Sequence, residues 1–298
     1  MKSNITYLLV CIFLLTAFSA KAQRETFTTA DSLLSMGRYG EASLELERIC
    51  FENRLDQSLV VSAVFKKVEC LKLQQKYQQI PNLLSRLDEL QPDDSLQQEI
   101  RLQKALGYYL SDQFEKAEKS ILPVFNLSIY NTQTWQLAAT VYVLSLNEQG
   151  KWSQAHQFLN GLLKSDTSLS EENERRMKIA IDSLYNPENI PKMKSIRKAR
   201  TLSLIFPGAG QAYNGNFGKG FVNLLLVSGS AGFTVYNVLQ TNYITAATAG
   251  VYLFLYFYFG GANQSNWLVP VKNQRKKAAF NQQLKAQVIG FNKQLFQQ

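Results

Sequence analysis

Acidic residues are absent from the carboxyl-terminal part of the chain. All 23 Asp and Glu lie before residue 192, whereas residues 192–298 hold 12 Lys and Arg, a net charge of +12. Residues 23–191 hold 18 Lys and Arg against those 23 acids, a net charge of −5. The formal charge of +9 is therefore an average over two unlike segments, which we expect to lie in different surroundings.

Histidine and cysteine are also scarce. The single histidine, His156, cannot assemble a multi-histidine metal site, and no recognisable nucleophile motif accompanies it. We therefore predict no catalytic residue, no metal, no cofactor and no enzyme activity. Cys11 lies in an apolar amino-terminal stretch, and the remaining Cys50 and Cys70 are too few for a disulfide-dense scaffold. We favour two buried thiols at these positions over a disulfide between neighbouring helices.

The positions of the basic residues favour a membrane, and not nucleic acid, as their partner. Lys219 is the only charged residue between Thr201 and Val271. Basic clusters flank that segment: Lys192, Lys194, Arg197, Lys198 and Arg200 before it, and Lys272, Arg275, Lys276 and Lys277 after it. Such clusters are typical of the ends of membrane spans and can contact anionic lipids.

The amino terminus has the pattern of an export signal. Lys2 precedes an apolar stretch from Leu8 to Phe18, and small residues before Gln23 suit a cleavage site. The stretch is short for a membrane span. We predict a signal peptide at residues 1–22, with an uncleaved anchor as the alternative. Both place the following residues outside the cytoplasm.

A short pattern recurs four times between residues 39 and 155. Each copy has an aromatic residue followed three positions later by a small or apolar residue: Tyr39 with Ala42, Tyr77 with Ile80, Phe114 with Ala117, and Trp152 with Ala155. The copies are separated by 38, 37 and 38 residues. Apolar residues at helical spacing surround each copy, which predicts a helix, a turn and a second helix in every unit.

These residues resemble the tetratricopeptide repeat, in which an aromatic and a small residue open the second helix of each unit. The second copy departs from the pattern because Pro81 follows Ile80, and the period is a few residues longer than the family's. A related helical repeat is therefore an alternative. The resemblance implies a solenoid over residues 23–186 whose concave face binds a protein or peptide partner; a spacer without a ligand is the other possibility. Residues 187–200 follow as a basic linker.

Two uncharged, mainly apolar runs come next, at residues 221–239 and 243–262. As helices, both are long enough to cross the roughly 30 Å hydrocarbon core of a bilayer. Because only Gln240, Thr241 and Asn242 separate them, we predict an antiparallel transmembrane hairpin with a tight turn. Small residues in both runs should let the two helices approach closely.

The sharpest motif precedes the hairpin and consists of Pro207, Gly208, Gly210, Gln211, Tyr213, Asn214 and Gly215. Its proline and glycines predict turns in an interfacial or re-entrant segment at residues 201–218. Gly218-Lys219 lacks the earlier glycine and the following hydroxyl of a phosphate-binding loop, so we reject nucleotide binding. The motif resembles the Pro-Gly-x-Gly-Gln-x-Tyr-Asn-Gly signature of a bacterial membrane domain of unknown function. The resemblance implies a membrane domain at residues 201–271 and brings no known chemistry.

Residues 272–298 form a basic tail with an apolar stripe. Its apolar residues lie three or four positions apart, which predicts an amphipathic carboxyl-terminal helix: Phe280, Leu284, Val288, Phe291 and Leu295. Such a helix would lie on the membrane surface or dock on a partner or on the repeat domain.

Export of the repeats conflicts with the positive-inside rule, because both basic clusters would then lie on the outer side. We favour clusters that bind anionic lipids there. A third crossing near residues 202–218 and failure of export are the alternatives.

The combined expectation is an all-α protein: a tetratricopeptide-like helical-repeat solenoid, a two-helix transmembrane hairpin and an amphipathic carboxyl-terminal helix. We expect an integral membrane protein of the bacterial cell envelope, in the inner membrane with the repeats in the periplasm. It would act as a scaffold or assembly factor that binds a protein partner. The alternative is a membrane subunit of a transport or lipid-handling complex in which the hairpin is the working part.

Overall fold

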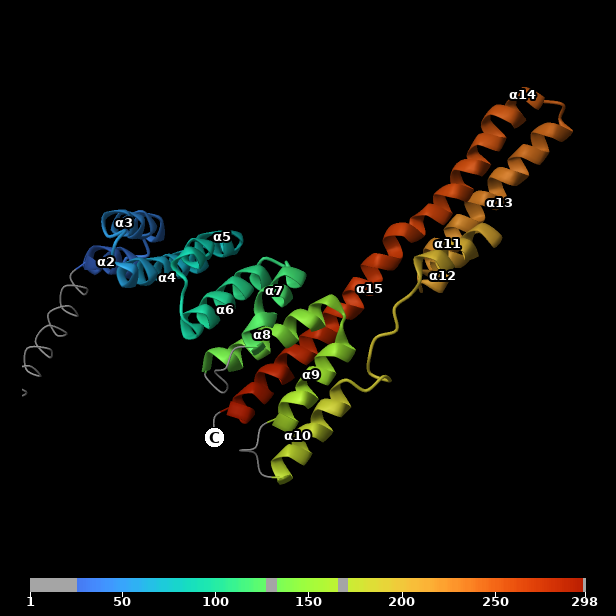
Figure 1. Cartoon of the computed structure of the whole chain (residues 1–298). Helices are drawn as coiled ribbons and strands as arrows, with labels where there is room; N and C mark the ends of the chain where they lie inside the picture. Colours follow the sequence, from blue (N-terminus) through green and yellow to red (C-terminus); the bar gives the residue numbers. More distant parts are fainter. Residues whose placement is uncertain (1–25, 127–132, 166–170, 297–298) are drawn as a thin grey trace, which may run out of the picture. The chain divides into compact units, whose positions relative to one another are not determined.

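The computed structural model describes residues 26–126, 133–165 and 171–296. All regular structure in these residues is helical, which confirms the expected all-α class (Figure 1). The predicted signal peptide lies outside the described residues. The chain divides into two compact units, one holding residues up to Ser165 together with those from Val288 onward, the other holding residues 166–287.

Helices of the first unit follow one another closely along the chain. Consecutive helices pack together, and α6 also contacts α8. The elements are α2 (Thr28–Ser35), α3 (Tyr39–Glu52), α4 (Gln57–Leu73), η1 (Tyr77–Gln79), α5 (Ile80–Leu84), η2 (Ser85–Leu90), α6 (Asp94–Leu110), α7 (Phe114–Ile121), η3 (Leu122–Asn126), α8 (Gln133–Gln149) and α9 (Trp152–Ser165). The helical segments α3, η1, α7 and α9 each begin at one of the four repeated aromatic residues.

The same turn precedes all four of these segments. Two residues before each aromatic, the backbone is left-handed, with φ of +74° at Gly37, +57° at Gln75, +59° at Asp112 and +78° at Gly150. The N–H of each turn residue donates to the carbonyl three positions back, and the next N–H donates to the carbonyl five positions back. These bonds satisfy the last carbonyls of the preceding helix. The sequence repeat therefore corresponds to a repeated backbone geometry.

The small residues of the repeat are packed in the core of the first unit. Ala42, Ala117 and Ala155 are fully buried, as is Ile80 in the second copy. One turn into each helix, a small side chain lets the neighbouring helix come close. Cys50 and Cys70 are free thiols whose pKa values are raised, chiefly because burial disfavours the charged thiolate.

The second unit begins with α10 (Glu171–Leu184) and continues through helices that surround residues 207–215, which we call the Pro-Gly motif. Its remaining elements are α11 (Ile196–Ile205), α12 (Ala209–Tyr213), α13 (Phe217–Leu239), α14 (Tyr243–Thr245), the π-helical turn η4 (Ala246–Gly250) and the part of α15 (Val251–Phe296) that precedes Val288. The left-handed turn recurs twice here, at Gly215 with φ +81° and at Thr241 with φ +60°, and aromatic Phe217 and Tyr243 again open the next helix.

The carboxyl-terminal tail differs from the expectation of a separate helix. Helix α15 continues without a break from Val251 to Phe296, and Pro270 lies inside it. No glycine occurs between Gly261 and Gly290 to end the helix, and an internal proline removes only one backbone donor. The residues of the basic tail therefore extend the second apolar helix.

Two helices are long and apolar enough to cross a membrane, α13 and the helix that starts at Tyr243. They lie antiparallel, because Gly250 approaches Thr234 near the turn while Gly261 approaches Asn223 further away. Within the most apolar 18-residue stretch of each helix, only 22% and 17% are buried. Neither helix is therefore the enclosed core helix of a water-soluble fold.

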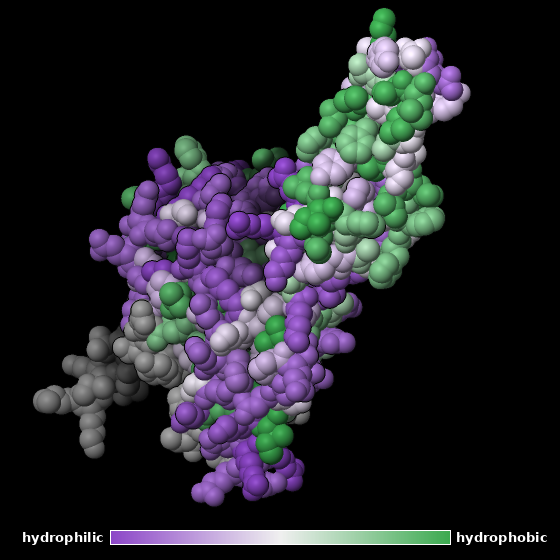
Figure 2. All heavy atoms as spheres, turned by 90° about the vertical axis from the view of Figure 1, so that its right-hand side faces the viewer, coloured by the Kyte–Doolittle hydropathy of each residue, from purple (hydrophilic) through white to green (hydrophobic). Residues whose placement is uncertain are grey.

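The face that α13 buries is small or polar, with the single exception of Val227. It consists of Gly220, Asn223, Val227, Ser230 and Asn237. The large apolar side chains of α13 point outward instead; examples are Phe221, Leu225, Phe233, Val235 and Leu239. Figure 2 shows hydrophobic side chains spread over the visible face of this hairpin, at the top of the view. The hairpin thus has the reverse of the usual apolar-inside arrangement.

The repeated turn predicts that glycine stabilises the protein at one position and not at the adjacent one. Gln75 is left-handed, a conformation that costs a side-chain-bearing residue about 1 kcal/mol or more, so Gln75→Gly should raise the free energy of unfolding by about 1 kcal/mol. Gln74 has φ −82°, so Gln74→Gly should give no gain. Thermal unfolding of the full chain in detergent, followed by circular dichroism, measures both. Equal stabilisation by the two substitutions would contradict the assignment.

Candidate functional site

The Pro-Gly motif folds into a junction between four helices. Helix α11 ends at Ile205 because Pro207 cannot continue it, and Gly208 turns the chain with φ +90° into the short α12. From Gly215 the chain enters α13, and α15 returns alongside. We call the contact region of Ser203, Gln211, Asn223, Gly261 and Gln264 the Gln211 junction.

Gln211 is fully buried and uses both ends of its amide. Its Nε2 donates to the Gly261 carbonyl at 2.7 Å and to Oε1 of Gln264 at 3.2 Å. Its Oε1 accepts from the Ser203 hydroxyl at 3.2 Å. One side chain of α12 therefore connects α11 to α15, and the loss of these bonds would leave buried polar groups without partners.

Three glycines allow close approach in this junction, two of them to another backbone and one to a side chain. A Cβ added to Gly210 would lie 2.1 Å from the Ala199 carbonyl oxygen and 2.2 Å from Oγ of Ser203. A Cβ on Gly208 would lie 2.1 Å from the Gly220 carbonyl oxygen. Gly261 leaves room for the Asn223 side chain in the same way. At Gly208 and Gly210 the added atom would meet the backbone of another helix, whereas at Gly261 it would meet the Asn223 amide, which would have to move.

Asn223 joins α13 to the motif and to α15. With its amide nitrogen facing Phe257, it donates to the Phe257 carbonyl at 3.1 Å and accepts from the Gly208 N–H at 3.2 Å. The Asn223 side chain is buried, on a helix whose other side chains are mostly apolar. A polar residue that is satisfied across a helix contact in this way fixes how the two helices face each other.

Basic side chains hold the outer end of the junction through backbone carbonyls. Lys194 donates to the carbonyl of Tyr213, and its ammonium lies 4.9 Å from the centre of the Tyr213 ring. The Lys194 backbone exchanges two hydrogen bonds with the Asn273 amide, at 2.9 and 2.8 Å. Lys272 donates to the carbonyl of Asn214. The basic linker and the basic tail are thereby connected to the motif.

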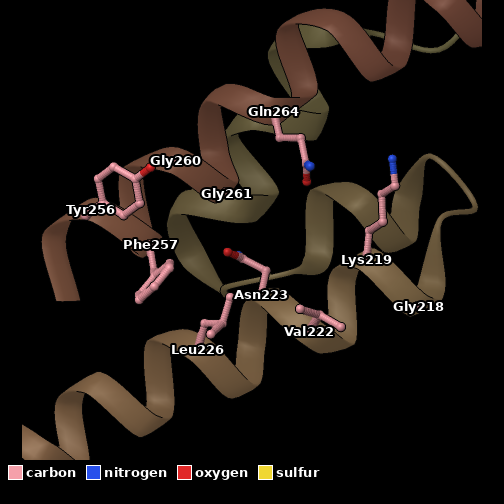
Figure 3. A pocket seen from close by; sticks show the side chains of 10 residues that line it. All are labelled: Gly218, Lys219, Val222, Asn223, Leu226, Tyr256, Phe257, Gly260, Gly261 and Gln264. Carbon is pink, nitrogen blue, oxygen red and sulfur yellow. The ribbon is translucent and has the colours of Figure 1, made fainter. Parts of the chain in front are cut away.

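Two clefts adjoin the junction. The first, which we call the apolar cleft, has a volume of about 450 Å³ between α13 and α15; its walls include Val222, Asn223, Leu226, Tyr256 and Phe257, with Lys219 at one end (Figure 3). The second, which we call the basic cleft, has a volume of about 530 Å³; its walls include Lys219, Trp267, Val271, Lys272, Arg275 and Lys276. Lys219 lines both clefts.

The structure brings most predicted motif residues into one place. Gly208, Gly210 and Gln211 form the inner part of the junction, and Tyr213 and Asn214 provide the carbonyls that bind Lys194 and Lys272. Ser203, Asn223, Gly261 and Gln264 were missed by sequence reasoning. For Asn223 a signal existed, since it is an amide within an apolar run. The repeated aromatic and alanine residues lie in the first unit, at helix starts and in its core.

The single histidine lies in the first unit and is not part of the Gln211 junction. His156 lies on α9 with its Nε2 3.0 Å from the Asn160 amide nitrogen. Across the described ranges, no group of three His, Cys, Asp or Glu side chains is placed to hold a metal ion.

Comparison with protein-family models, curated proteins and solved structures found no match to the chain. The inference of function therefore rests on the geometry of the chain itself.

The close packing at Gly210 predicts a large effect from one methyl group. Gly210→Ala should lower the stability of the folded protein in detergent by roughly 1–3 kcal/mol, because the new Cβ overlaps α11. Gly232→Ala, on the open face of α13 with no atom within 4 Å, should be neutral or slightly stabilising. The temperature at which half of the monodisperse protein is lost on heating, measured by size-exclusion chromatography, compares them. A Gly210→Ala protein as stable as wild type would refute the packing described.

Proposed function

We propose that the chain is a membrane-anchored scaffold of the cell envelope, in which the α13–α15 hairpin inserts into a lipid bilayer and the helical first unit binds a protein partner. The observation that carries the anchor is the reversed hairpin, with amides and glycines inside and large apolar residues outside. In water such a surface would be strongly disfavoured, whereas in lipid it is the favourable arrangement.

The dimensions and charges of the hairpin support the same proposal. Helix α13 has 23 residues, a length of about 34 Å, which is sufficient for a hydrocarbon core of roughly 30 Å. Lys219 lies at the start of α13 and the Lys272–Lys277 cluster lies beyond the apolar part of α15. Charged residues at these positions would meet lipid headgroups and not acyl chains.

The tetratricopeptide-like assignment of the first unit is supported by its four equivalent turns and by the buried alanines that follow them. Arrays of this kind present extended surfaces to protein partners. On α3, Leu44 and Phe51 are 73% and 68% exposed. They are seven residues apart and therefore share one face of the helix. We propose this face as part of the partner surface.

A second candidate function places the work in the hairpin. The apolar and basic clefts both belong to the second unit, and they favour a role in lipid handling or transport in which the first unit is accessory. The two candidates share the membrane anchor and differ in which unit the function depends on.

The anchor predicts how the full chain behaves during membrane extraction. Membranes washed with alkaline carbonate should retain the protein, and detergent should release it. Leu225→Lys with Phe233→Lys should sharply reduce retention, because a charge near the centre of a span costs about 3 kcal/mol. Leu44→Lys with Phe51→Lys changes apolar residues of the first unit that are even more exposed and should leave retention unchanged. Release of the wild-type chain by carbonate alone would disprove the anchor.

The scaffold proposal predicts which substitutions abolish partner binding. Cross-linking in intact cells, followed by purification of the full chain, should capture a defined partner. Leu44→Glu with Phe51→Glu should remove it, because both apolar contacts would be lost. Gln57→Glu with Gln78→Glu adds the same charge at exposed polar positions of the first unit and should keep it. Loss of the partner only with Asn223→Leu in the apolar cleft would favour the second candidate function.

A further inference from the structure

The basic cleft concentrates positive charge on one side of α15 without a carboxylate to neutralise it. Arg275 and Lys276 follow Lys272 by three and four residues, so the three side chains lie on the same side of α15 and line the cleft. Lys219 reaches the cleft from the start of α13. Among the residues that the structure describes, none of these four forms an ion pair, and no Asp or Glu occurs in residues 192–298 of the sequence. The cleft is therefore an uncompensated anion-attracting site.

The donors in the cleft are held in place but are not saturated. Lys272 gives one hydrogen bond to the Asn214 carbonyl, and Nζ of Lys276 lies 3.5 Å from the Lys192 carbonyl oxygen. An ammonium has three donors, so both retain protons for a ligand. In the described part of the chain, no hydrogen bond or ion pair involves Arg275. Its guanidinium can bind a phosphate with two parallel hydrogen bonds.

The apolar lining of the cleft points to a ligand with both a charge and a hydrocarbon part. Trp267 and Val271 form part of the wall, and the Lys219 ammonium lies 4.9 Å from the centre of the Trp267 ring. Tryptophan in this setting is typical of the membrane–water interface. Lys219 also closes one end of the apolar cleft, whose Val222, Leu226 and Phe257 lie further along the hairpin (Figure 3).

The order of the two clefts along α15 matches the order of parts in a phospholipid. From Phe257 in the apolar cleft to Arg275 in the basic cleft is a distance of about 27 Å along a helix. The apolar cleft lies toward the hairpin turn, where acyl chains would be, and the basic cleft lies toward the charged end, where phosphates would be. Each volume, about 450 and 530 Å³, is in the range of known small-molecule sites.

We propose that the basic cleft is a binding site for the phosphate of an anionic glycerophospholipid, with one acyl chain extending into the apolar cleft. The inference rests on the proposed insertion of the hairpin into a bilayer and adds a specific lipid site to it. Arg275 and Lys219 bind the phosphate, Lys272 and Lys276 supply further positive charge, and Trp267 contacts the glycerol region.

Native mass spectrometry of the purified full chain in detergent tests the site. Phosphatidylglycerol added at increasing concentrations should bind with a saturable first site, and phosphatidylcholine should bind much more weakly. Lys219→Gln with Arg275→Gln should weaken the first phosphatidylglycerol site roughly tenfold or more, since each basic residue contributes about a factor of five. Arg275→Gln alone, which removes no protein contact, should weaken it by about fivefold.

The matched control is Arg197→Gln with Lys277→Gln, which removes two charges outside the cleft. It should leave the first site unchanged, whereas equal weakening would reduce the proposal to general charge attraction and overturn it. Displacement of the lipid by inorganic phosphate at similar concentration would also overturn it, in favour of a free-phosphate site. If all variants remain in carbonate-washed membranes but bind phosphatidylglycerol like wild type, the cleft proposal fails while the anchor stands.

Discussion

The arrangement of the second unit depends on one constraint: α13 and α15 touch through small and polar residues, so their large apolar side chains face outward. Gly250 against Thr234 and Gly261 against Asn223 bring the helices close along their length. A contact made of glycines and amides buries little hydrocarbon, so the hydrophobic effect in water cannot hold the pair together. Close packing and hydrogen bonds in an apolar solvent can. A bilayer is therefore the medium in which this hairpin is consistent with its own surface.

The Gln211 junction fixes the hairpin to the segment that precedes it. Because Gln211 bonds to Ser203, Gly261 and Gln264 at once, α11 and α12 cannot move independently of α15. The backbone contacts of Gly208 and Gly210 add a steric requirement that no other residue meets. Both clefts are lined by α13 and α15, the helices that this junction connects.

The sequence allowed the all-helical class, both apolar helices and the helix starts of the repeats to be predicted, because each depends on local periodicity or on a turn. Gly37 and Gly150 are the residue type that favours a left-handed turn, whereas Gln75, Asp112 and Thr241 adopt a positive φ without a glycine and could not be recognised from the sequence. The partners of Gln211 lie up to 53 residues away in the chain, so only the fold reveals them. The continuity of α15 was missed because a basic cluster suggested a boundary that the backbone does not have.

Spin labels placed one at a time along α13 test the reversed hairpin most directly, in the full chain with Cys11→Ser, Cys50→Ser and Cys70→Ser, reconstituted in a bilayer. On the outward positions between Phe221 and Leu239, accessibility to oxygen relative to a water-soluble nickel chelate should be highest midway and fall toward both ends. Labels on the buried face, such as Ser230, should be poorly accessible to both reagents. High chelate accessibility along the whole outward face would show that α13 lies in water and would contradict the account.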